Sequence, residues 1–166
     1  MANKQSFTPE EWTKILESTM LAGMAVSAAE PSGLWGSLKE AFASSSALAA
    51  AKADPGSNEL VKAVVADFET PEGRSSVQDG LRKLLAGAKP ADAVQRSLAN
   101  LREVSAILAA KAPSDAPAFK AWLSSISQKV AEASSEGGFL GIGGVQVSDA
   151  EKATLGDIAK ALGTSA

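Results

Sequence analysis

The stretch DAPAFKAWLSSISQKVAEA, residues 115–133, decides the fold class of this chain of 166 residues. Its apolar side chains recur every three or four residues, which is the spacing of a helix with one buried face. The pattern predicts a helix that starts near Asp115 and buries its central Trp122. The members of the apolar stripe are Phe119, Trp122, Leu123, Ile126, Val130 and Ala133.

Helix start and stop signals continue on both sides of this stretch. Residues 8–11 (Thr-Pro-Glu-Glu) and 148–151 (Ser-Asp-Ala-Glu) are capping boxes, which mark the first turn of a helix. Gly163 follows the last expected helix, and glycine commonly occupies the position just after a helix end. We therefore predict an all-α fold, a single domain over residues 1–166 with a flexible N-terminus at residues 1–7. Its seven expected helices cover about residues 9–29, 35–53, 60–68, 71–88, 90–112, 115–133 and 149–162.

The composition agrees with a helical domain and excludes several chemistries. Ala accounts for 33 of the 166 residues and has the highest helix propensity. The chain contains no Cys, His or Tyr, which excludes disulfides, thiol catalysis and every site built on His. No signal-peptide pattern or long apolar run is present, so we expect a cytoplasmic protein whose contact with a membrane is peripheral at most.

Charge is distributed unevenly along the chain. The net charge is −3, which does not favour a nucleic-acid partner. Residues 61–130 carry 10 basic and 7 acidic side chains, whereas acidic side chains are in excess in the segments on both sides. We expect oppositely charged faces of one domain, which either meet each other or face water.

A glycine-rich segment at residues 136–145 interrupts the helical pattern. It places five glycines among bulky apolar side chains, but Val145-Gln146 stands where a phosphate-binding loop requires Lys followed by Ser or Thr. One interpretation is a connection between helices whose apolar side chains enter the core. The alternative is that residues 137–145 form a loop that binds a small molecule, a lipid or a membrane surface.

The two ends of the chain resemble each other. Residues 33–36 (Gly-Leu-Trp-Gly) align without a gap with residues 138–141 (Gly-Phe-Leu-Gly), and each block follows an apolar helix that contains a Trp. The repeat predicts two helical hairpins related by a pseudo-twofold axis. Packing of the Trp12 and Trp122 helices against each other would bring the loops after Glu30 and Glu136 to one end of the domain.

The C-terminal hairpin, with Ala-x-x-Glu-Gly at residues 133–137 and Val-Ser-Asp-Ala-Glu-Lys-Ala-Thr-Leu at residues 147–155, resembles the TerB family of tellurite-resistance proteins. The resemblance implies a pseudo-symmetric bundle of about seven helices, a place in stress-response complexes, and divalent-cation binding by acidic residues of the hairpins. Hard cations such as Ca²⁺ and Mg²⁺ take oxygen ligands. The candidate metal ligands are Glu30, Glu40, Glu136, Asp149 and Glu151.

Other roles stay open for these carboxylates. Glu151 is also placed to cap the last helix, and Asp149 to interact favourably with the dipole of that helix. The leading hypothesis for the whole chain is a non-enzymatic interaction module with a protein partner, and a homo-oligomer is a further option. The alternatives are a small-molecule, lipid or membrane-surface binder, and an enzyme that would have to use Asp, Glu, Lys or Ser with a metal.

Overall fold

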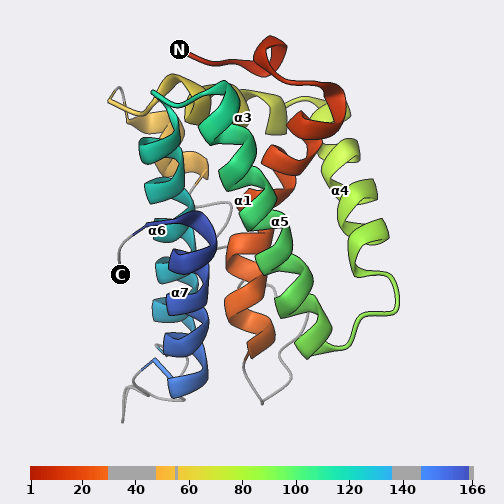
Figure 1. Ribbon diagram of the computed structural model, residues 1–166, viewed down its shortest axis with the longest axis vertical. Helices are drawn as coiled ribbons and strands as arrows, with labels where there is room; N and C mark the ends of the chain where they lie inside the picture. The colour runs from red at the N-terminus through yellow and green to blue at the C-terminus, as the bar shows by residue number, and fades with distance from the viewer. Residues whose placement is uncertain (30–47, 55, 136–146, 165–166) are drawn as a thin grey trace.

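The structure, a computed structural model, describes residues 1–29, 48–54, 56–135 and 147–164 (Figure 1). Within these residues it is helical and contains no strand, so the all-α prediction is confirmed. Of the helix expected at residues 35–53, residues 48–53 are helical and the remainder lies outside the described residues. The elements are η1 (Lys4–Ser6), α1 (Pro9–Ala29), α3 (Glu59–Phe68), α4 (Pro71–Leu85), α5 (Pro90–Lys111), α6 (Ala116–Ser135) and α7 (Asp149–Leu162).

Both predicted capping boxes are present and explain where α1 and α7 begin. At the start of α1, the Thr8 amide donates to Glu11 Oε2 at 2.7 Å and the Glu11 amide donates to Thr8 Oγ1 at 3.2 Å. Each box satisfies two amides that have no partner inside the helix. The last helix stops at Gly163, whose φ of 67° is the left-handed conformation that glycine adopts at least cost.

Helices α1 and α5 form the centre of the bundle, with α6 and α7 on one side and α4 on the other (Figure 1). The core between them is largely aliphatic, and Phe119, Leu123 and Leu101 are fully buried in it. Helix α1 packs against α6, as predicted for the Trp12 and Trp122 helices. Both helices end toward the lower end of the molecule in Figure 1, where α7 begins. None of the described helices is both long and apolar enough to span a bilayer.

Trp122 departs from its predicted place at the centre of the buried stripe. Its side chain is only half-buried and packs edge-on against Phe119, with 5.5 Å between the ring centroids. The fully inward row is Phe119, Leu123 and Ile126, and Trp122 lies one position off that row at the margin of the core. The sequence spacing did not distinguish the middle of the stripe from its edge.

The N-terminal segment, predicted as flexible, makes specific contacts. Ala2 and Phe7 are both buried, and the ring of Phe7 lies 5.8 Å from the ring of Trp12. The amide of Ala2 donates to Asp115 Oδ2 at 2.8 Å. Residues 1–7 therefore lie across the end of the bundle where α1 and α6 begin.

Candidate functional site

Of the five predicted metal ligands, the structure describes two, both at the start of α7. Glu151 is buried and forms the second capping box: the Ser148 amide donates to Glu151 Oε2 at 2.8 Å, and the Glu151 amide donates to Ser148 Oγ at 3.2 Å. Asp149 is exposed, with one carboxylate oxygen 3.8 Å from Lys152 Nζ. Both residues thus have the helix-terminal roles that the sequence left open beside metal binding.

The other three ligands, Glu30, Glu40 and Glu136, lie outside the described residues, as does the glycine-rich segment 137–145. Among the residues that are described, no three Asp, Glu, His or Cys side chains gather closely enough to hold a metal ion. The structure therefore neither assembles nor excludes the predicted cation site. It does place the ends of α1 and α6, which precede Glu30 and Glu136, at the same end of the bundle (Figure 1).

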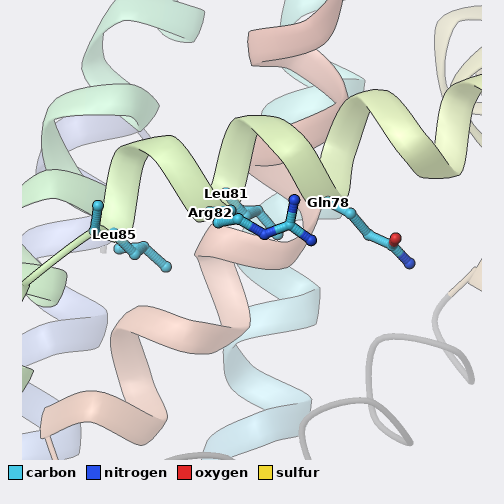
Figure 2. Close-up of a pocket in the computed structure, with 5 residues that line it drawn as sticks. Gln78, Leu81, Arg82 and Leu85 are labelled. Atoms are coloured by element: carbon cyan, nitrogen blue, oxygen red, sulfur yellow. The ribbon is translucent and has the colours of Figure 1, made fainter.

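A different candidate site lies on α4, at the opposite edge of the bundle. A shallow hollow of about 550 Å³ runs along this helix (Figure 2). We call its lining the α4 surface; its members are Gln78, Leu81, Arg82, Leu85 and Ala86. Leu81 and Leu85 are partly exposed, so apolar area remains accessible in the hollow. A shallow apolar surface of this kind can receive the apolar face of a helix.

Arg82 is the one charged side chain among the described residues that line the α4 surface, and the guanidinium of nearby Arg74 donates to the carbonyls of Phe68 and Glu69. Arg74, Gln78 and Arg82 follow one another at a spacing of four residues and so share one side of the helix, beside Leu81 and Leu85. Arg82 is strongly exposed and pairs with Asp79 at 2.9 Å. A surface ion pair of this kind is worth at most about 1 kcal/mol, so a carboxylate from elsewhere can compete for the guanidinium.

Both ends of α4 are held by hydrogen bonds. At its start, Thr70 Oγ1 accepts from the Gly73 amide at 3.0 Å. At its end, Arg96 of α5 donates to the carbonyl of Leu84 at 2.8 Å and to that of Ala86 at 3.1 Å. The sequence predicted that this helix runs to about Ala88; it ends at Leu85, because Arg96 satisfies the last carbonyls and the chain then turns at Gly87.

Under α4 lies a buried carboxylate, Glu17 of α1. Only 6 % of Glu17 is exposed, and Asn100 Nδ2 of α5 donates to its Oε2 at 3.2 Å. Its burial raises the pKa of this carboxyl, and the opposing effects of Lys14 and of the Asn100 hydrogen bond only partly offset that rise. Two further buried oxygens, Ser97 Oγ and Asn100 Oδ1, have no hydrogen-bond partner.

Neither the α4 surface nor Glu17 was predicted from the sequence. The signal for the surface was present, since Arg74, Gln78 and Arg82 recur every four residues beside Leu81 and Leu85. No comparable signal marks Glu17, because a single acidic residue in a helix is ordinarily solvated. Its burial depends on α4 and α5, which are distant in sequence.

A second groove, of about 400 Å³, lies between α6 and α7 and is lined largely by small side chains, among them Ser124, Gly156 and Ala159. A Cβ atom added to Gly156 would meet no atom within 4 Å, so the groove is open at that point. Like the α4 surface, it is lined by one basic side chain among the described residues, here Lys152.

Comparisons with protein-family models, with curated proteins and with solved structures find no match to this chain. The resemblance to the TerB family therefore depends on the short hairpin motifs alone.

Proposed function

We propose that this protein is a non-enzymatic interaction module whose α4 surface binds an acidic amphipathic helix of a protein partner. The observation that supports this proposal is the pairing of partly exposed apolar side chains, Leu81 and Leu85, with Arg82 on the same side of α4. Helices commonly dock by laying an apolar face into such a groove. Carboxylates beside that face would meet Arg82, so the charge at the margin selects an acidic partner over a basic one.

Two features of the sequence support a non-enzymatic role and a cellular process for this interaction. The absence of His, Cys and Tyr removes the commonest catalytic groups and favours binding over catalysis. The resemblance of the C-terminal hairpin to the TerB family supports a stress-response or tellurite-resistance context in the cytoplasm. That context is part of the proposal and is independent of the α4 surface.

The binding proposal is tested with two synthetic helical peptides that share a leucine face and carry either Glu or Lys on the opposite face. We expect the full-length protein to bind the Glu peptide saturably, as measured by fluorescence anisotropy of the labelled peptide. Leu85→Asp should abolish binding, because it places a charge in the apolar hollow. Binding should also weaken with added salt, which screens exposed charges.

A matched control is available on α6. Lys129 is exposed and lies on the other side of the bundle, so Lys129→Glu changes the net charge without touching the α4 surface. This variant should bind the Glu peptide as the wild type does. Equal affinity for the two peptides, or undiminished binding by Leu85→Asp, would refute the proposed docking mode.

A divalent-cation site in the acidic hairpins is a second proposal. It is supported by the shared direction of α1 and α6, both of which end at one end of the bundle (Figure 1) and precede Glu30 and Glu136 in the sequence. Ca²⁺ or Mg²⁺ bound there would raise the free energy of unfolding by about 2.7 kcal/mol at a hundredfold excess over the Kd.

Thermal melts in millimolar CaCl₂ or MgCl₂, compared with melts in a chelator, measure that effect. We expect a higher Tm with the cation and no shift in the double variant Glu136→Gln, Glu151→Gln. Gln also serves in a capping box, so the second substitution should leave the start of α7 intact. Coincident melts of the wild type with and without cation would eliminate the site and leave these carboxylates as helix caps and surface groups.

A further inference from the structure

Glu17 of α1 and Gly80 of α4 lie in close contact. Gly80 lies directly over the carboxylate, and a Cβ atom at this position would collide with Glu17 Oε1. A side chain at position 80 therefore requires the buried end of Glu17 to move. We expect substitution at either residue to change how α4 rests on α1.

Little compensates the charge of Glu17 in this position. Helix α5 presents neutral groups, Asn100 and Ser97, and α4 presents Gly80. The charged group that acts on Glu17 is Lys14, one turn earlier on α1, and Lys14 Nζ is engaged by Glu103 of α5 at 2.7 Å. An ionised carboxylate that is buried with one hydrogen bond is costly, whereas a neutral carboxyl is not.

Among the described α-helices, α4 also has the fewest buried residues for its length. Among its 15 residues only Gly73 and Val77 are buried. Its attachment otherwise depends on its two capped ends and on partly buried leucines. Segments with few buried apolar contacts open at lower free energy than the rest of a fold.

We propose that Glu17 is a proton-sensitive latch for α4: in its neutral form it stays buried beneath Gly80, and on ionisation it admits water and α4 separates more often from α1. The latch would regulate the α4 surface, and only this consequence rests on the proposed function. Burial also fixes the direction in which the stability of the latch changes with pH. Because burial raises the pKa of Glu17 in the folded chain, the state with Glu17 buried beneath Gly80 is fully favoured below the ordinary pKa of a glutamate. That state loses stability as pH rises through the raised value.

Hydrogen exchange of the α4 amides in the full-length protein tests the latch without any partner. Each measured exchange rate is first corrected for the intrinsic base-catalysed rate at the same pH. The resulting protection of the α4 amides should fall with rising pH, by up to about tenfold per pH unit. In Glu17→Gln, protection should stay flat and exceed that of the wild type at neutral pH. The buried amides of α6 serve as an internal control that should not respond.

Asp157→Asn is the matched control, since it removes one exposed carboxylate charge of α7 that pairs with Lys160 and leaves Lys14 and Glu103 as they are. It should keep the pH dependence of the wild type. Parallel pH profiles for the wild type and Glu17→Gln would overturn the latch. That result would leave the peptide titration unaffected, so failure of the latch and failure of the docking proposal can be told apart.

A second set of variants tests the geometry directly. Gly→Ala within a helix ordinarily favours the helix, so without the collision Gly80→Ala would raise the protection of α4. We expect the opposite, a fall, together with recovery in Gly80→Ala, Glu17→Asp, where the side chain is one methylene shorter. Glu17→Gln should not rescue, because it keeps the length. Increased protection in Gly80→Ala alone would contradict the proposed contact.

Discussion

Replacing Phe119 with Ala is expected to lower the free energy of unfolding by about 3–5 kcal/mol, the usual cost of removing a fully buried aromatic ring. Phe119 has no exposed area and belongs to the row by which α6 faces the core. Urea denaturation followed by circular dichroism measures the change.

Trp122→Ala is the informative comparison. Trp122 is only half-buried, and the free energy lost scales with the apolar area removed from water, so this variant should cost about 1–2 kcal/mol. A larger loss for Trp122→Ala than for Phe119→Ala would mean that α6 presents a different face to the core from the one described.

Asp115→Ala is the second substitution with a large expected effect, about 2–3 kcal/mol of stability, the range for hydrogen bonds to a charged group. Asp115 is 4 % exposed and joins three parts of the chain. Its Oδ2 accepts from the Ala2 amide and its Oδ1 accepts from Asn58 Nδ2, each at 2.8 Å. Removing the carboxylate leaves both donors without their partner and releases the N-terminal segment.

This effect should depend on pH in a defined direction. Burial alone would raise the pKa of Asp115, but the hydrogen bonds from Ala2 and Asn58, together with the charge of the N-terminus, lower it below its ordinary value. The stabilisation is therefore fully present above the ordinary pKa of an aspartate and is lost as pH falls through the lowered value.

Denaturation of the wild type and Asp115→Ala at several pH values tests both statements. The difference in stability should be constant near neutral pH and shrink in acid. Asp157→Ala, which removes an exposed carboxylate that pairs with Lys160 at 3.2 Å, is the control and should change stability by less than about 1 kcal/mol. A pH-independent difference for Asp115→Ala would show that its carboxylate has no special role in the folded state.

Features encoded by neighbouring residues were predicted well from the sequence. The capping boxes at residues 8–11 and 148–151 gave the starts of α1 and α7, because the partners in such a box are three residues apart and need no distant contact. Gly163 ends α7 for a similarly local reason.

Features that depend on distant contacts were not predicted. Arg96 ends α4 from another helix, and Asp115 anchors Ala2 across 113 positions of sequence. Glu17 is buried by α4, to which no sequence pattern connects it. The hydrophobic spacing gave the faces of the helices, but which positions lie at the centre of a face follows from packing; Trp122 shows this.

The affinity of the protein for the Glu and Lys peptides, measured for the wild type and for Arg82→Glu, tests the central claim most directly. The wild type should prefer the Glu peptide by about tenfold or more, a difference of about 1.4 kcal/mol. Arg82→Glu should reverse that preference, because it inverts the charge at the margin of the hollow, whereas Lys129→Glu should retain it. An identical preference in the wild type and Arg82→Glu would contradict the assignment of the α4 surface as the docking site.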